Sequence, residues 1–127
     1  MTRGKKPAAK RAANKQTGAT GRRAATAASD TDLELVEAAF SAVTEIDRRY
    51  RKATINDQIK LKPKRDEAFA AYSLARLKLL EAGMISTGQD LADMLALKAE
   101  IDRAAITQDL IIAAARVAIF LAKLAAK

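Results

Sequence analysis

Large apolar residues recur every three or four positions from Leu33 onward, and this spacing predicts helices with one apolar face. The first run predicts a helix over about 32–61. Its end is placed before Pro63, because proline lacks a backbone donor and disfavours helical geometry in the residue before it. The apolar stripe of this helix consists of Leu33, Val36, Phe40, Val43 and Tyr50. Asp30, Thr31 or Asp32 is expected to cap its start.

Two further helices are predicted beyond Pro63. The second covers about 64–82, with Gly83 and Met84 placed for a Schellman stop against Leu79. The third covers about 88–126, since Ser86 and Gln89 have the spacing of a capping box. A break near residue 106, where Thr107 can cap again, is the alternative to one continuous rod.

These elements predict an all-α fold. It has three helices, or four if the last one breaks, arranged as a small helical bundle or as a coiled-coil-like hairpin with a long C-terminal helix. We divide the chain into a disordered basic arm over 1–29 and a helical domain over 30–127. The arm contains glycine and proline but no periodic large side chains, so it cannot bury enough surface to offset its ordering entropy.

The apolar segment over 110–126 could be interpreted as a membrane-binding segment. Arg116 and Lys123 divide it into runs shorter than the 18–20 residues or so that a bilayer requires. Together with Asp102 and Asp109 they recur every seven residues and form one narrow polar stripe. Packing of this helix on the first two helices and on a symmetry mate is therefore favoured, with interfacial membrane binding as a low-weight alternative.

Charge separates the arm from the rest of the chain. The first 29 residues contain eight lysines and arginines and no acid, whereas residues 30–127 contain 15 basic and 15 acidic residues, so the arm holds the whole net charge of +8. In its mixture of lysine, alanine and proline the arm resembles linker-histone tails and ribosomal-protein extensions. Residues 30–47 then carry six acids and no base, and residues 48–65 eight bases and one acid.

This pattern predicts binding to phosphate backbones without base readout. If the first two helices fold back near Pro63, the basic block over 48–65 gathers at the hairpin tip, and arm and tip contact a polyanion at two places. The candidate nucleic-acid-binding residues are Arg3, Lys5, Lys6, Lys10, Arg11, Lys15, Arg22, Arg23, Arg48, Arg49, Arg51, Lys52, Lys60, Lys62, Lys64 and Arg65. The candidate oligomer or partner interface consists of Leu33, Val36, Phe40, Val43, Tyr50, Leu110, Val117, Phe120, Leu121 and Leu124.

Nothing in the sequence predicts catalysis. Cysteine and histidine are both absent, which removes the usual zinc ligands and the commonest general base. No glycine pattern cradles phosphates, and the acids are explained by helix starts. We expect no catalytic residue, cofactor, metal or small-molecule substrate, and, with no signal peptide or membrane span predicted, a location in the cytoplasm or within a virion or nucleoprotein assembly.

The sequence thus predicts a non-catalytic oligomeric helical protein that binds DNA or RNA without sequence specificity, as an architectural, packaging or ribonucleoprotein subunit. The alternative is a structural or adaptor subunit of a larger assembly or virion, in which the helices carry the interaction with partner proteins.

Overall fold

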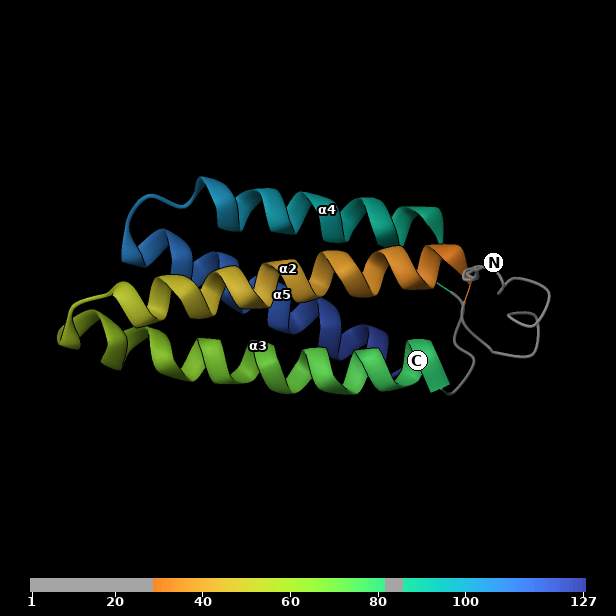
Figure 1. Ribbon diagram of the computed structural model, residues 1–127, viewed down its shortest axis with the longest axis horizontal. Coiled ribbons are helices and arrows are strands. Elements are labelled where there is room, and N and C mark those ends of the chain that lie inside the picture. The colour runs from red at the N-terminus through yellow and green to blue at the C-terminus, as the bar shows by residue number, and fades with distance from the viewer. Residues whose placement is uncertain (1–28, 82–85) are drawn as a thin grey trace, which may run out of the picture.

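The computed structural model describes residues 29–81 and 86–127. Within them it contains four helices and no strand, which confirms the predicted all-helical fold (Figure 1). The helices are α2 (Asp30–Lys52), α3 (Ile55–Glu81), α4 (Gly88–Arg103) and α5 (Thr107–Ala125). Apart from Ser29, the predicted disordered arm lies outside the described residues, as do Gly83 and Met84 of the predicted Schellman stop.

The helices form two antiparallel hairpins that stack on each other, one of α2 and α3 and one of α4 and α5. In Figure 1, α2 and α4 run in one direction while α3 and α5 return in the other. The hairpins meet with α2 against α4 and α3 against α5. Each helix therefore packs on a parallel neighbour from the other hairpin as well as on its own antiparallel partner.

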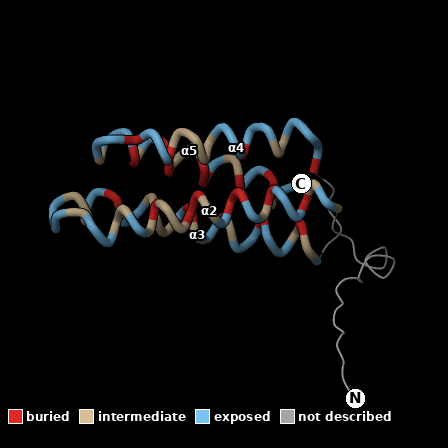
Figure 2. The backbone as a smooth tube through the Cα atoms, turned by 45° about the horizontal axis from the view of Figure 1, so that its top comes forward, coloured by how far each residue is buried: buried red, intermediate tan, exposed pale blue. Residues whose placement is uncertain are grey.

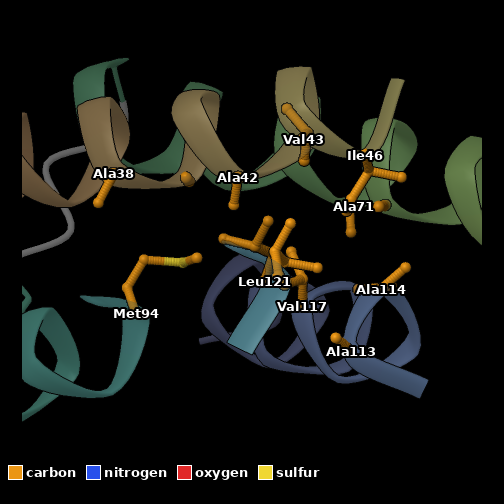
Figure 3. Packing of buried hydrophobic residues seen from close by; sticks show 14 of the residues in the cluster. Ala38, Ala42, Val43, Ile46, Ala71, Met94, Ala113, Ala114, Val117 and Leu121 are labelled. Atoms are coloured by element: carbon orange, nitrogen blue, oxygen red, sulfur yellow. The ribbon is translucent and has the colours of Figure 1, made fainter. Parts of the chain in front are cut away.

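The core lies between the two hairpins and is rich in alanine. Figure 2 shows the buried residues as short segments spaced along each helix. Figure 3 shows Val117 and Leu121 of α5 pointing toward Ala42 of α2, with Met94 of α4 reaching in beside them. Small alanine side chains let the helices approach closely, while each fully buried large apolar side chain contributes about 1.5–3 kcal/mol. The largest fully buried apolar side chains are Leu35, Val43, Ile46, Leu61, Leu79, Met94, Ile101, Val117 and Leu121.

The predicted boundary between the first two helices is wrong. α2 ends at Lys52, and α3 begins at Ile55 and continues through Pro63. The turn is held by polar contacts: the Thr54 hydroxyl accepts from the Asp57 amide at 3.2 Å, and the Gln58 side chain donates to the Tyr50 carbonyl at 3.0 Å. Pro63 is tolerated because it lies on the exposed face of α3, where solvent can satisfy the carbonyl that loses its donor.

The predicted apolar stripe of α2 is also displaced from the real one. The buried face consists of Leu35, Ala38, Ala39, Ala42, Val43 and Ile46. Of the predicted stripe only Val43 is fully buried, whereas Leu33 is 37% and Phe40 52% exposed. The predicted helical spacing of the large side chains is correct. Alanine occupies much of the core-facing surface, however, so the stripe predicted from the large residues lies on a different face of α2.

Helix starts use residues next to those predicted. Ser29, rather than Asp30, Thr31 or Asp32, is the cap of α2, and its hydroxyl accepts from the Asp32 amide at 3.0 Å. Thr87 replaces Ser86 as the cap of α4 and forms a capping box with Asp90.

The break near residue 106 is confirmed, because α4 ends at Arg103 and α5 starts at Thr107. Ile106, not Thr107, occupies the cap position of α5, and no side chain caps it. In the part of the chain that the structure describes, no helix combines the length and apolarity needed to cross a membrane.

Candidate nucleic-acid interface

The hairpin turn at Ala53 and Thr54 defines the tip of the first hairpin, about ten residues earlier than predicted. Eight candidate basic residues from 48 to 65 lie in the described helices on either side of it. Since α3 rises about 1.5 Å per residue, Lys62, Lys64 and Arg65 lie roughly 10–15 Å along the helix from its start. The structure therefore does not gather all eight at one point.

Arg49 takes part in the fold itself. Its guanidinium donates to the carbonyl oxygens of Ala104 at 2.6 Å, Ile101 at 3.1 Å and Asp102 at 3.3 Å. These carbonyls belong to the end of α4, where helical partners run out. Glu45 accepts from Arg49 Nε at 2.9 Å and orients it. Arg49 therefore caps α4, and its assignment to a phosphate stays a prediction.

Arg65 is likewise held inside the first hairpin. Its guanidinium carbon lies 5.1 Å from the ring centre of Tyr50 and 5.2 Å from that of Phe69. The same group pairs with Asp47 at 2.7 Å and with Asp66 at 2.8 Å. Cation–π contacts and two carboxylates together hold the guanidinium between α2 and α3. The assignment of Arg65 to nucleic acid stays a prediction, and these internal contacts would compete with a phosphate.

Four more basic residues pair with carboxylates one turn away on their own helix. The pairs are Arg48 with Glu45, Arg51 with Asp47, Lys62 with Asp66, and Lys64 with Glu67. The block of eight bases and one acid in the sequence is thus largely neutralised by acids just outside its bounds. Exposed pairs of this type contribute only about 0–1 kcal/mol, so an incoming phosphate can compete for these cations.

This pairing lowers the pKa values of two of the carboxylates. The hydrogen bond from Arg48, with a further one from Arg49, lowers the pKa of Glu45. Burial by itself would raise the pKa of Asp47, but the hydrogen bond and charge of Arg65 and the nearby Arg51 lower it overall.

Lys52 and Lys60 are the tip lysines without a carboxylate partner among the described residues. Both are exposed, Lys52 at the end of α2 and Lys60 in the second turn of α3. Ion pairing within the chain does not compete for these two charges, so they are the tip residues best placed for a phosphate.

The other half of the predicted site lies outside the described residues. It comprises the arm residues Arg3, Lys5, Lys6, Lys10, Arg11, Lys15, Arg22 and Arg23. The arm joins the body at Ser29, whereas the tip lies at the far end of α2 (Figure 1). A helix of 23 residues is about 35 Å long, so arm root and tip are separated by about one turn of duplex DNA.

The starts of α2 and α4, next to the arm, carry several acidic residues. Glu34 and Glu37 are exposed near the start of α2, and Asp90 and Asp93 lie near the start of the parallel α4. The Thr87 amide, together with Lys127, lowers the pKa of Asp90 despite partial burial. Carboxylates therefore gather where α2 and α4 start, while the ends of α3 and α5 bring Lys78 and Lys123 to the same end of the body.

The predicted oligomer-interface residues separate into two groups. Val43, Leu110, Val117, Leu121 and Leu124 are at most 4% exposed and pack inside the chain's own bundle, which corrects them as surface contacts. Leu33 and Phe40 are exposed, and Val36, Tyr50 and Phe120 are partly buried against the core. Most apolar residues of the α5 segment that the membrane alternative uses are covered by the other helices, whereas Ile112 and Ile119 are exposed.

No three acidic side chains in the described ranges lie close enough together to hold a metal ion. The surface hollows are shallow, and the most apolar one lies between α4 and α5. Comparison with protein-family models found no match, and comparisons with curated proteins and with solved structures found no similar protein either.

Proposed function

We propose that this protein binds nucleic acid through backbone charge, with the basic arm as the main contact and the exposed lysines of the hairpin tip as the second. It also self-associates through its helical body, as an architectural, packaging or ribonucleoprotein subunit does. The observation that carries the proposal is the charge of the arm: eight basic residues and no acid in the first 29 residues, attached to a body of balanced charge.

The basic composition of the arm favours binding to phosphates. Each lysine or arginine that neutralises a phosphate releases a condensed counterion, which provides affinity without base recognition. The described helices support a backbone-only mode because their free cations are few and scattered, as Lys52 and Lys60 illustrate. Sequence-specific contact would instead require several side chains directed together into a groove.

The separation of arm root and tip adds a geometric element. A body about 35 Å long, aligned with a duplex, places its two positive elements about one helical turn apart. The acids near Ser29 disfavour close approach of phosphates at that end of the body. The arm then contacts the phosphate backbone at that end, while the tip is where the helical body itself contacts it.

A salt titration of duplex binding tests this proposal. If four to eight phosphates are engaged, the logarithm of affinity should fall with the logarithm of salt at a slope of about −4 to −7. A full-length variant with the eight arm bases replaced by glutamine should lose most of this slope and retain its circular dichroism. A flat salt response of the natural chain would sink the proposal.

The second candidate is a structural or adaptor subunit whose helices carry the interaction. Its support is the large apolar surface that the described helices expose, including Phe40 at 52%, Leu74 at 58% and Ile119 at 56%. Isolated exposed apolar residues are ordinary, but a series of them over four helices favours contact with protein. A folded protein that binds no nucleic acid at low salt would favour this candidate.

A further inference from the structure

The exposed face of α5 has a repeating order of charged and apolar side chains. Its members, at helical spacings of three and four, are Asp109, Ile112, Arg116, Ile119 and Lys123. Ile112 is 46% and Ile119 56% exposed, on a helix whose opposite face is fully buried. The face therefore presents two large apolar side chains framed by charges.

A shallow groove between α4 and α5 accompanies this face. Arg116 bridges it by donating to both carboxylate oxygens of Glu100 on α4 at 3.1 Å. On one side of this bridge is a hollow lined by Asp109, Ile112 and Arg103. On the other side is a more apolar hollow lined by Ala96, Leu97, Ile119, Phe120, Asp93 and Lys123.

The charges of this face are self-complementary about its centre. Asp109 and Lys123 have opposite sign, and each is seven residues from Arg116. Neither has an ion-pair partner within residues 29–81 and 86–127. Ile112 and Ile119 lie four and three residues from Arg116, on either side of it. An antiparallel copy turned about Arg116 would therefore set acid against base and isoleucine against isoleucine.

We infer that this face binds the same face of a second copy, with the two α5 helices antiparallel around a two-fold axis near Arg116. Asp109 of each copy then pairs with Lys123 of the other, as an isologous interface requires. Ile112 of each copy packs on Ile119 and the apolar hollow of the other. This inference rests on the self-association in the proposed function and assigns it a surface.

The two Arg116 side chains at the centre of the interface have the same charge, but each is neutralised within its own chain. Two-fold symmetry brings the two Arg116 side chains near each other, and like charges in contact are unfavourable. Each guanidinium, however, is already paired with Glu100 of its own chain. The groups at the axis are therefore neutral pairs rather than bare cations.

The size of the contact predicts a weak dimer. One pair of helices meeting over about four turns buries less than the roughly 1,200–2,000 Å² of a standard stable interface. The dimer should therefore dissociate on dilution, and sedimentation equilibrium of the full-length chain, free of nucleic acid, over a range of concentrations measures it directly.

Charge reversal provides the decisive test. Asp109→Lys sets lysine against lysine at both ends of the interface, and Lys123→Asp sets aspartate against aspartate, so each variant alone should dimerise at least about tenfold more weakly. When the two variants are mixed, both contacts of the heterodimer become lysine with aspartate. The mixture should regain the dimer. Recovery together with a weakening by each single variant indicates the antiparallel pairing, because a parallel pairing would set like charges against each other in the natural chain already.

Glu37→Lys is the matched control, because it reverses an exposed charge on α2 outside this face. It should leave the dimer unchanged. Circular dichroism checks that α5 stays helical in each variant. If a reversal unfolds the protein, Ile112→Gln replaces it and should also weaken the dimer about tenfold.

The outcomes separate this inference from the proposed function. A natural chain that stays monomeric at all concentrations, or single variants that dimerise normally, or a mixture that shows no recovery, overturns the α5 interface. Filter binding of nucleic acid by the same samples is an independent measurement. Salt-dependent binding by a monomeric chain would support the nucleic-acid proposal and contradict the α5 interface. A dimer that binds no nucleic acid would support the α5 interface and contradict the nucleic-acid proposal.

Discussion

The buried carboxylate of Asp32, at the start of α2, accepts hydrogen bonds of 2.6 Å from both the backbone amide and the hydroxyl of Ser86, which precedes α4. Its second oxygen accepts from the Ser29 amide at 3.1 Å. One side chain thus completes the capping box of α2 and fixes the entry of the parallel helix in the other hairpin. At the opposite end of this helix pair, Arg49 caps the end of α4.

Asp32→Ala is expected to lower the free energy of unfolding by about 2–4 kcal/mol, because it leaves the buried donors of Ser86 and the partly buried amide of Ser29 without an acceptor. Asp90→Ala is the matched control, since Asp90 has the same capping position in α4 but bridges no buried group. It should cost only about 1 kcal/mol. Urea unfolding followed by circular dichroism measures both, and equal losses would contradict the bridging role.

Arg49→Leu is expected to destabilise the fold by about 1.5–3 kcal/mol, because charged hydrogen bonds to three carbonyls at the end of α4 are lost. Arg48→Leu removes the same charge from the neighbouring position, where the side chain is about half exposed and pairs only with Glu45. Its effect on the free energy of unfolding should be much smaller. Thermal unfolding of the two variants distinguishes a capping arginine from a surface one.

Pro63→Ala is expected to stabilise the protein by about 1–2 kcal/mol. Alanine restores a backbone hydrogen bond inside α3, and this gain outweighs the additional freedom of the unfolded chain. Lys64→Ala, at the adjacent position, controls for the change to a good helix former. A loss of stability in Pro63→Ala would indicate that the proline shapes the start of α3 in a way that its packing requires.

Pro63 also shows where sequence reasoning reached its limit. Local propensity placed a helix end there, but burial of Leu61 and Ala68 on the other face of α3 carries the helix through. A better signal was present in the spacing of serine or threonine three residues before aspartate, at Ser29, Thr54 and Thr87. Each of these hydroxyls accepts from the aspartate amide.

The charge block was harder to predict. The basic residues of 48–65 were evident from the sequence. Their acidic partners lie just outside this block and come into contact with it only when the chain is helical; they are Glu45, Asp47, Asp66 and Glu67. Arg65 reaches Asp47 across the hairpin, 18 residues away, and that contact depends on where the turn falls. The alanine-rich face of α2 was missed because the prediction weighed only large side chains.

Stability should be insensitive to pH between about 5.5 and 7.5, because the chain has no histidine, and should fall in acid. The pKa of Asp66 is lowered by its hydrogen bond from Lys62 and by Arg65, and those of Glu45 and Asp47 are lowered as well. Carboxylates with a lowered pKa in the folded state contribute stability above their unfolded pKa of about 4, which is lost as pH falls through the folded value. Urea unfolding at a series of pH values should show this loss, and Asp47→Asn should reduce it.

The tip lysines provide a test of where nucleic acid meets the helical body. Joint replacement of Lys52 and Lys60 by glutamine should reduce the magnitude of the salt slope of duplex binding by about two, since each phosphate contact contributes about 0.9. Lys62 and Lys64 replaced together remove the same charge, but these lysines are already paired with Asp66 and Glu67. Their loss should reduce the slope by less than half as much. Equal reductions would instead mean that the ion pairs open to phosphate and that the contact extends along α3, away from the turn.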